Sequence, residues 1–338
     1  MTQKRGTFRS KAVALGRLFT TSESEFKAFM GTYNALFTDS PENTKDDYDK
    51  GVPLRGYKQG SSVELAQYYK IIHLLCTLGS VEKMYMPPAI DADKSVLENQ
   101  NLLERRLAND IAVGAGATVL DLGCGCGAIA AHISELTGCS VYGINIDESQ
   151  IEKARNNLDQ ARLRFAFGDF NKPLDFGNNT FDAVYNVQAL TYATDLESTF
   201  KEAFRVLKPG GKLFSNDVAA LDNYDRGNDQ HRLLIQHTRE LTAFGGFWHY
   251  RYWEDAFKNA GFAVLASEGK SAVEMIRKEN ALYAKFQMIF SFLSRIRVVP
   301  RKIDAMIRRM HANCESYIQA EEEGLLTLNW RYVVQKPA

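Results

Sequence analysis

The sequence predicts an α/β fold built around a doubly wound parallel sheet, and two observations predict it. Between residues 116 and 218, short β-rich runs alternate with segments of helical periodicity. A turn that contains Gly123, Gly125 and Gly127 joins the first of these runs to the first helix. Because parallel strands need a long crossover, which is usually a helix, the alternation indicates successive right-handed βαβ units.

The elements of this core follow one another at short intervals. Strands are expected at 117–123, 139–145, 163–169, 181–187 and 211–217, and helices at 128–136, 148–161 and 196–207. The sequence KPGG predicts a turn before the last of these strands. Beyond the core, a helix end and a strand are expected at 259–269, mainly helix at 271–323 and a closing strand at 325–337.

The composition excludes several classes of protein. The 338 residues include 41 Lys plus Arg and 41 Asp plus Glu, so the formal net charge is zero and no nucleic-acid partner is expected. The five cysteines are odd in number and include no Cys-x-x-Cys pair, so neither a disulfide scaffold nor a metal site is expected. We find no apolar run of the ~18 residues that a membrane span needs. The basic N-terminus lacks a signal-peptide core but also fits a mitochondrial presequence, and a cytoplasmic protein is the default expectation.

The glycine turn indicates the type of ligand. Read from Gly123, a dinucleotide fingerprint requires glycine at position 128, where the chain has Ala128, and the third glycine is Gly127 instead. Asp121 lies two residues before the first glycine, and its carboxylate would repel a phosphate. The pattern therefore favours a ligand with a cationic amino-acid group over a dinucleotide.

The stretch LDLGCGCG resembles motif I of the class I S-adenosylmethionine-dependent methyltransferases, and the resemblance continues in register through GIN, GDF, FDAVYN and FRVLKPGG. It implies a Rossmann-like, doubly wound sheet of seven strands and S-adenosyl-L-methionine as the cofactor. Asn145 stands where the family usually has an acid for the ribose hydroxyls, and its amide can still donate and accept hydrogen bonds. The residues that the resemblance assigns to the cofactor are Asp121, Gly123, Gly125, Gly127, Asn145, Gln150, Asp169, Phe170 and Asn186.

The resemblance and the helical patterns together divide the chain into four parts. Amphipathic patterns at 24–37, 62–79 and 97–113 indicate a mostly helical N-terminal segment. We expect a helical N-terminal region at 1–110, a methyltransferase core at 111–270, a basic helical lid at 271–325 and a closing strand of the core sheet at 326–338.

Further stretches resemble one branch of this family, the sterol and triterpenoid C-methyltransferases. They include SQIEKA after the second strand, residues 221–232 and the C-terminal tail, so that the similarity covers residues 65–338. Three motifs of the branch are altered. Tyr-Glu-x-Gly-Trp-Gly is replaced by CTLGSV at 76–81, Glu-Ala-Thr-Cys-His-Ala by QALTYA at 188–193, and Tyr-Glu-Trp by NDV at 216–218.

These replacements predict the acceptor. Methylation of an alkene creates a carbocation, which aromatic faces and a carboxylate stabilise. Because such side chains are lost here, we expect an acceptor carbon that is already nucleophilic, namely C-4 of a sterol nucleus, as in nematode members of the branch. The alternatives are the side-chain carbon C-24 of a sterol, another lipid (a triterpenoid, phosphoethanolamine or a quinone), and a non-catalytic lipid-binding protein that retains the fold.

A general base must take one proton from the acceptor carbon. The candidates are His231, Asp217, Tyr192 and Tyr85. A histidine has a suitable pKa, and Asp217 lies at the carboxyl end of an expected strand, where α/β sheets place ligands. Each candidate also has a structural reading: a helix surface for His231, a turn cap for Asp217 and core packing for both tyrosines.

Residues 281–311 contain seven Lys or Arg and a single acid, with aromatic residues and Met between them. Such a basic amphipathic stretch predicts contact with an anionic lipid surface, or else a helical lid with a solvated basic face. The expected partners are therefore a sterol or other lipid substrate and, at the periphery, the endoplasmic reticulum membrane, with a homo-oligomer left open.

Overall fold

The computed structural model describes residues 40–57, 83–158 and 161–338, together with the single residues 16, 20, 22 and 24. The helices expected at 24–37 and 62–79 lie outside the described residues, as does the altered motif at 76–81.

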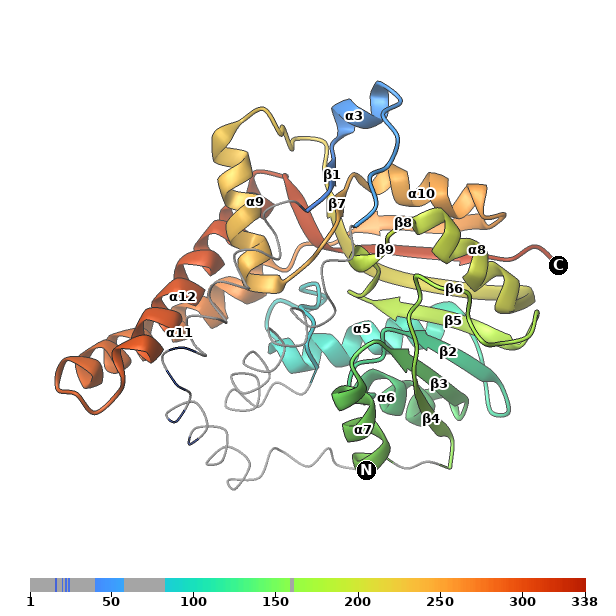
Figure 1. The fold of residues 1–338 in the computed structure, drawn as a ribbon, viewed down its shortest axis with the longest axis horizontal. Coiled ribbons are helices and arrows are strands. Elements are labelled where there is room, and N and C mark those ends of the chain that lie inside the picture. The colour runs from blue at the N-terminus through green and yellow to red at the C-terminus, as the bar shows by residue number, and fades with distance from the viewer. Residues whose placement is uncertain are drawn as a thin grey trace.

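Within the described part of the chain, seven strands form one sheet in the order β4, β3, β2, β5, β6, β9, β8 (Figure 1). They are β2 (Thr118–Leu122), β3 (Ser140–Asn145), β4 (Leu163–Phe167), β5 (Phe181–Val187), β6 (Leu207–Ala220), β8 (Ala263–Gly269) and β9 (Leu326–Gln335). The five strands β2 to β6 are parallel, and β9 runs antiparallel between β6 and β8. This order confirms the predicted doubly wound α/β fold with seven strands. The turn expected at 208–211 is instead the first part of β6, which begins at Leu207.

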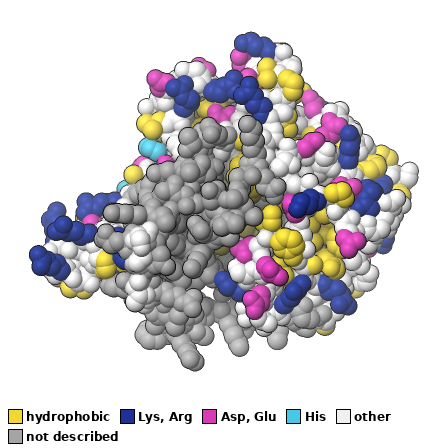
Figure 2. Space-filling model, viewed as in Figure 1, with side chains coloured by type: hydrophobic (Ala, Val, Ile, Leu, Met, Phe, Trp, Pro, Cys, Tyr) yellow, Lys and Arg dark blue, Asp and Glu magenta, His cyan; other side chains and the backbone are white. Residues whose placement is uncertain are grey.

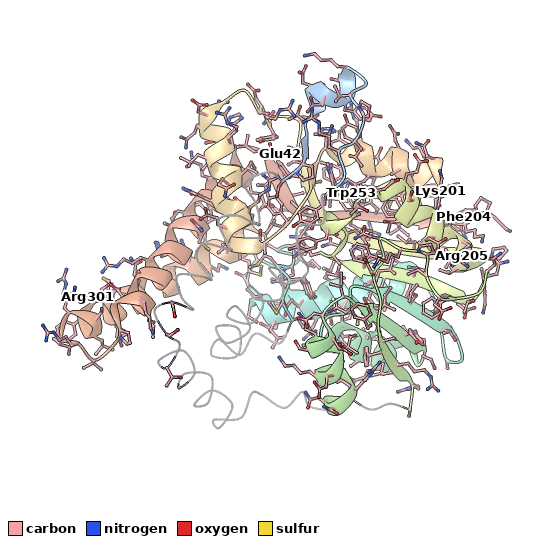
Figure 3. All side chains as sticks on the ribbon, in the orientation of Figure 1. Glu42, Lys201, Phe204, Arg205, Trp253 and Arg301 are labelled. Atoms are coloured by element: carbon pink, nitrogen blue, oxygen red, sulfur yellow. The ribbon has the colours of Figure 1, made fainter. Side chains whose placement is uncertain are left out.

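Helices cover both faces of the sheet, as a doubly wound fold requires. On one face, α5 (Val96–Ile111), α6 (Ala128–Thr137) and α7 (Glu148–Asn157) share a core with the sheet. On the other, α8 (Leu196–Val206) and α10 (Tyr250–Asn259) share a second core, in which Trp253 is fully buried (Figure 3). Because side chains alternate along a strand, each strand end offers one residue to each face.

A third core lies beyond the carboxyl end of β6. There α9 (Asp229–Thr242) and α11 (Val273–Arg295) pack with α12 (Arg301–Glu322), which contacts both. The α11–α12 hairpin extends away from the sheet (Figure 1). Neither helix of this pair, nor any other among the described residues, combines the length and apolar character that crossing a membrane requires.

The N-terminal region is described at 40–57 and from residue 83 onward. The helix expected at 97–113 is confirmed as α5, whereas residues 40–57 form β1 (Glu42–Asn43), the short helix α3 (Lys45–Asp49) and an extended stretch. β1 pairs in parallel with β7 (Phe247–Trp248), and Nε1 of Trp248 donates to the carbonyl oxygen of Arg55 at 2.8 Å. Residues 40–57 are thus joined to a segment that is distant in the sequence.

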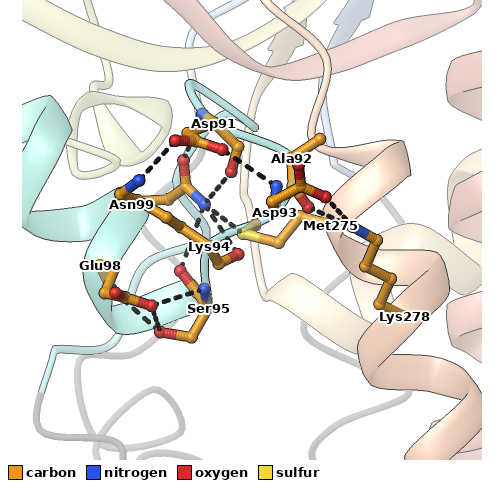
Figure 4. A network of polar contacts seen from close by, with 9 residues as sticks. All are labelled: Asp91, Ala92, Asp93, Lys94, Ser95, Glu98, Asn99, Met275 and Lys278. Atoms are coloured by element: carbon orange, nitrogen blue, oxygen red, sulfur yellow. Dashed lines mark hydrogen bonds and ion pairs between the residues drawn. The ribbon is translucent and has the colours of Figure 1, made fainter.

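The loop at 83–95 runs from the N-terminal region to α5 and is fixed by polar contacts (Figure 4). Nδ2 of Asn99 donates to three backbone carbonyls of this loop and its end, at 2.9 to 3.2 Å. From α11, Lys278 Nζ donates to the carbonyl of Ala92 (2.7 Å) and to Oδ1 of Asp93 (2.9 Å). The starts of α5 and α11 are therefore held to the same loop.

Gly143 in β3 provides a test of the packing beneath the glycine turn. A Cβ added there would lie 2.7 Å from Cβ and Sγ of Cys124 and 2.8 Å from Phe165. Since such overpacking forces backbone shifts, Gly143→Ala should lower the free energy of unfolding by about 1–3 kcal/mol in urea titrations. Gly114→Ala is the matched control, because a Cβ at Gly114 meets no atom within 4 Å. Equal stability of the two variants would contradict this packing.

Candidate active site

Four adjacent strands carry the predicted cofactor residues at their carboxyl ends. In spatial order, Asp169 and Phe170 follow β4, Asn145 ends β3, the glycine turn follows β2, and Asn186 lies near the end of β5. Because these strands are parallel, their carboxyl ends share one edge of the sheet, which is where α/β sheets bind ligands. The fold therefore brings residues from 121 to 186 along one edge.

The three glycines of the turn differ in what surrounds them. Their φ angles are +85°, +54° and +77° for Gly123, Gly125 and Gly127, in the region that favours glycine. A Cβ at Gly123 would lie 2.5 Å from Cβ of Ala189, and one at Gly127 would lie 2.5 Å from the ring of Phe165. These two glycines thus allow close packing within the protein, whereas Gly125 is free of such crowding.

Gly125 faces Gln150, one of the predicted cofactor contacts. Apart from its chain neighbours, the one atom of the described residues within 4 Å of an added Cβ at Gly125 is Oε1 of Gln150, at 3.2 Å. Nδ2 of Asn145 lies 3.4 Å from the same Oε1, and Nε2 of Gln150 donates to Oδ2 of Asp147 at 3.2 Å. The structure therefore brings Gly125, Asn145 and Gln150 together. Sequence reasoning missed Asp147, whose signal was its position as the acid just before α7, where it caps the helix.

Asp121 lies on the sheet face that α5 and α6 cover. It is 2% exposed, and the hydroxyl of Tyr185 donates to its Oδ2 at 2.8 Å. Burial, opposed by that hydrogen bond, raises the pKa of Asp121 to about 7. The carboxyl is thus poised to gain or lose a proton near neutral pH.

Asp169 and Phe170 lie at the outer part of the edge. Oδ1 of Asp169 accepts from the backbone N–H of Asn171 at 3.0 Å, and the ring of Phe170 packs against the core that contains α8. Asn171, which sequence reasoning missed, donates to the carbonyl of Tyr192 (3.1 Å) and accepts from the N–H of Thr194 (2.7 Å). The turn after β4 is thereby tied to the segment after β5.

Asn186 and Asp217 lie on the opposite face of the sheet from Asp121. Nδ2 of Asn186 donates to Oδ2 of Asp217 at 3.1 Å, and Oδ1 of Asn186 is buried with no hydrogen-bond partner among the described residues. A buried acceptor without a partner costs free energy unless a ligand satisfies it. The ammonium of a methionine-type ligand is a donor of the required kind, so Asn186 and the open space at Gly125 both fit S-adenosylmethionine.

Asp217 is 1% exposed and uses its carboxylate within the protein. It accepts from the backbone N–H groups of Ala189 (3.1 Å), Leu190 (2.9 Å) and Val218 (3.0 Å) in addition to Asn186. Burial raises the pKa of Asp217 to about 7, against these four hydrogen bonds. The contacts to Ala189 and Leu190 make Asp217 the cap of the 3₁₀ turn η1 (Leu190–Tyr192).

The other predicted bases also use their polar atoms in contacts within the protein. Nδ1 of His231 accepts from the N–H of Asp225 at 3.1 Å, so the proton of a neutral ring is on Nε2. The hydroxyl of Tyr192 donates to the carbonyl of Ala243. The hydroxyl of Tyr85 lies 2.7 Å from Oε1 of Glu104. These contacts are those of structural residues, and the assignment of a general base stays a prediction.

A buried charged cluster around Glu104 was not predicted. Glu104 and the side chain of Lys83 are at most 1% exposed, and Nζ of Lys83 lies 2.6 Å from Oε2 of Glu104. His132 and Tyr85 contact the same carboxylate. The burial of Glu104 could have been predicted from its position in the sequence. Glu104 lies four residues after Gln100, on the buried face of α5.

Gln188 occupies the position of the acid that the C-methyltransferase branch carries. Its φ is +49°, and its Nε2 donates to the carbonyls of Met86 (2.7 Å) and Leu328 (3.0 Å) while its Oε1 accepts from the N–H of Met86 (3.1 Å). A carboxylate cannot donate to carbonyls, so the amide is required for this contact. Gln188 thereby ties the loop at 83–95 to the ends of β5 and β9.

The family model of a methyltransferase domain matches residues 120–215. A sterol 24-C-methyltransferase of Saccharomyces cerevisiae is 39% identical over 171 residues, which cover 49% of this chain and 44% of that protein. The chain thus spans about half the length, or slightly less, of the curated relatives that it matches. These relatives do not support the expected C-4 specificity, since their name states C-24.

Solved structures are similar in fold. The [4+2]-cyclase SpnF has a TM-score of 0.64 at 19% identity, covering 84% of this chain and 99% of its own. A putative sarcosine dimethylglycine methyltransferase from Galdieria sulphuraria has a TM-score of 0.62 at 20% identity, covering 78% and 97%. The chain therefore carries a class I methyltransferase domain, and the similar structures show its Rossmann-like fold. A methyltransferase domain supports S-adenosylmethionine as the expected methyl donor.

The space above Gly125 can be tested by ligand binding. Gly125→Ala adds a Cβ at a φ of +54° and 3.2 Å from Gln150, so the variant should bind S-adenosylhomocysteine at least about tenfold more weakly in calorimetric titrations. Gly51→Ala is the control, because Gly51 has a similar φ of +67° with no atom within 4 Å of its Cβ and lies in the turn after α3. Unchanged affinity of Gly125→Ala would show that no ligand approaches this glycine.

Asp121 makes stability depend on pH. Its pKa of about 7 in the folded state exceeds the ordinary value of 3.8, so between these values the folded chain binds more protons than the unfolded chain. The contribution of Asp121 to stability therefore falls as pH rises from about 4 to 7. Asp121→Asn removes this dependence, and its stability relative to the unchanged chain should rise by about 2–3 kcal/mol between pH 5 and pH 8.

Urea unfolding at the two pH values measures this difference. Asp182→Asn is the control, because the pKa of Asp182 is lowered, through hydrogen bonds from Lys208 and the N–H of Thr118 that outweigh its desolvation, and its variant should gain no stability at pH 8. The same gain at pH 5 and pH 8 for Asp121→Asn would mean that Asp121 does not titrate in this range.

Proposed function

We propose that this chain is an S-adenosylmethionine-dependent C-methyltransferase that acts on a sterol, with the side-chain carbon C-24 as the favoured acceptor. The observation that carries the proposal is the row of predicted cofactor residues on four adjacent strand ends around Gly125. The likeness to sterol 24-C-methyltransferases supports the acceptor.

The residues of the edge fit the parts of the donor. S-adenosylmethionine supplies an electrophilic methyl group. The carboxylate of Asp121 and Oδ1 of Asn186 are acceptors for its ammonium, and the amides of Asn145 and Gln150 for its ribose hydroxyls. Phe170 offers an apolar surface to the adenine. The role of these residues is to hold donor and acceptor in line and to exclude water.

At C-24 the acceptor is an alkene carbon. Its electron pair forms the new carbon–carbon bond to the methyl group, the bond from that methyl to sulfur breaks, and a positive charge develops on the neighbouring carbon. A buried carboxylate stabilises such charge most effectively in a low-dielectric site. We assign this role to Asp217, which is buried near the carboxyl end of β6; because four donors hold its oxygens, its charge would act on the substrate at a distance and not by direct contact. The sterol then loses one proton to complete the reaction.

One observation favours C-4 as a second candidate. The amide of Gln188 is needed to hold Met86 and Leu328, so this position has no carboxylate for an alkene reaction. A nucleophilic carbon beside a ring ketone would not need that charge. Because Asp217 provides a carboxylate next to Gln188, where it accepts from the N–H of Ala189, C-24 remains the first proposal.

The acceptor is tested with purified chain, methyl-labelled donor and three acceptors. These are a sterol with a C-24 double bond, a 3-keto sterol without a side-chain alkene, and phosphoethanolamine. We expect label in the first, at least about tenfold above the other two. Gly125→Ala is the negative control, because its weaker cofactor binding is measured separately.

Label only in the 3-keto sterol would show that the acceptor is a sterol but that the methylated carbon is C-4 and not C-24. Label only in phosphoethanolamine would contradict the proposal that the acceptor is a sterol. Binding of S-adenosylhomocysteine without transfer to any acceptor would favour a lipid-binding protein that retains the fold.

A further inference from the structure

The distal part of the α11–α12 hairpin, residues 285–301, forms a hairpin tip that lies far from the sheet. Figure 1 shows both helices extending beyond α9, and Figure 3 shows Arg301 near their outer end. α11 ends at Arg295, and α12 begins at Arg301 after a short turn.

The hairpin tip exposes large apolar side chains. Met288, Ile289 and Phe292 lie three and four residues apart on α11, so they share one face of the helix. Ile296 and Val298 continue this apolar surface into the turn. The exposed fractions are 68%, 54% and 62% for the helical residues and 54% and 58% for those of the turn. Half of the exposed large apolar residues of the described chain are in this one segment.

The exposure does not come from poor packing of the hairpin. Ser294, Val299 and Ile303 are at most 6% exposed, and Oγ of Ser291 donates to Oδ1 of Asp304 at 2.7 Å. At the other end, Lys278 of α11 is bound to the loop at 83–95 (Figure 4). The hairpin is therefore an ordered support that presents an apolar face.

Basic side chains surround this apolar face. Lys285, Arg295, Arg297 and Arg301 are all exposed, and Figure 2 shows Lys and Arg gathered on the protruding end. Asp304 is the one acid within 281–311 and is bound by Arg308. The segment is thus strongly positive in a chain whose formal net charge is zero.

The apolar face and the basic side chains around it together favour one kind of binding partner for the hairpin tip. An apolar face with a basic rim binds the interface of an anionic membrane, where apolar side chains enter the acyl boundary and cations contact the headgroups. A second copy of the same surface is disfavoured, because it would bring two clusters of positive charge together. Neither helix is apolar and long enough to span a bilayer, so the contact would be interfacial.

We propose that the hairpin tip docks on the surface of anionic lipid membranes, through Met288, Ile289, Phe292, Ile296 and Val298 and through the surrounding basic side chains. This surface does not depend on the proposed methyl transfer, and its test does not measure activity.

The first test is sedimentation of the full chain with vesicles. Vesicles of phosphatidylcholine with 30% phosphatidylserine should retain the protein, and phosphatidylcholine alone should retain at least about tenfold less. Arg295→Gln with Arg301→Gln should weaken binding roughly 25-fold, since each basic residue near an anionic surface contributes about fivefold. Arg162→Gln with Arg164→Gln removes two exposed charges at β4 and is the matched control.

A second test reports insertion. The Trp of a Phe292→Trp variant should be quenched by brominated lipid, in excess of the quenching seen for the unchanged chain, because Trp248 and Trp253 are fully buried and Trp330 is only partly exposed on β9, away from the hairpin tip. Leu265→Trp is the control, since Leu265 is 51% exposed on β8.

Three outcomes would overturn the proposal. They are equal binding to neutral and anionic vesicles, equal losses for the tip and control charge variants, and equal quenching of the two introduced tryptophans. Concentration-dependent self-association that Phe292→Ser abolishes, without vesicle binding, would assign the face to a second copy instead. Circular dichroism and urea unfolding of each variant separate loss of binding from loss of folding.

Discussion

One carbonyl oxygen holds the glycine turn in place. The oxygen of Ile144 accepts from the backbone N–H groups of both Gly123 and Cys124, each at 3.0 Å. This double hydrogen bond extends the pairing of β2 and β3 past the last ladder residue and draws the turn down against β3. The bare Gly143 next to it leaves room for the side chain of Cys124. Gly125 is then the part of the turn left open to a ligand, and the candidate cofactor residues are arranged around it.

Two buried carboxyl groups flank this turn on opposite faces of the sheet. Asp121 is held by Tyr185 and Asp217 by four donors, and burial raises the pKa of each to about 7. Such groups reduce stability at neutral pH, and they are typical of functional sites, where the cost is offset by interaction with a ligand. The strained backbone of Gln188, with a φ of +49°, lies beside Asp217 in the same region. The carboxyl edge of the sheet therefore contains two buried carboxyl groups and one strained residue, each of which lowers stability.

The parallel core could be predicted from sequence, because β2 to β5 and residues 211–217 of β6 are short β-rich runs and helical patterns lie between them. The glycine turn and its neighbours could be predicted for the same reason, since their spacing is local. The first part of β6 could not, because KPGG favours a turn. α10 could not, because its first residues, YRYW, favour a strand and become helical only through the burial of Trp253 and Phe257 in the core.

Interactions between distant segments account for the other differences. β1 is two residues long and exists only through its pairing with β7, about 205 positions later. Gln188 reaches Met86 across 102 positions, and Lys83 reaches Glu104 from an adjoining loop. Contacts between distant segments leave no periodic pattern of apolar residues in the sequence, so they could not be predicted from it. The candidate bases Asp217, Tyr192 and Tyr85 are likewise bound by groups distant in the sequence, whereas His231 is bound by the nearby Asp225.

The position of β9 has a consequence for the order of folding during synthesis. β9 lies between β6 and β8, so the strand of this sheet that comes last in the described chain is an interior strand. Strands β2 to β6 can pair as they leave the ribosome, whereas β8 has no neighbour until residues 326–335 arrive. Until then one side of β6 and all of β8 have unpaired backbone groups, which are templates for pairing with other chains. The nascent chain therefore depends on protection of these edges until translation of β9 is finished.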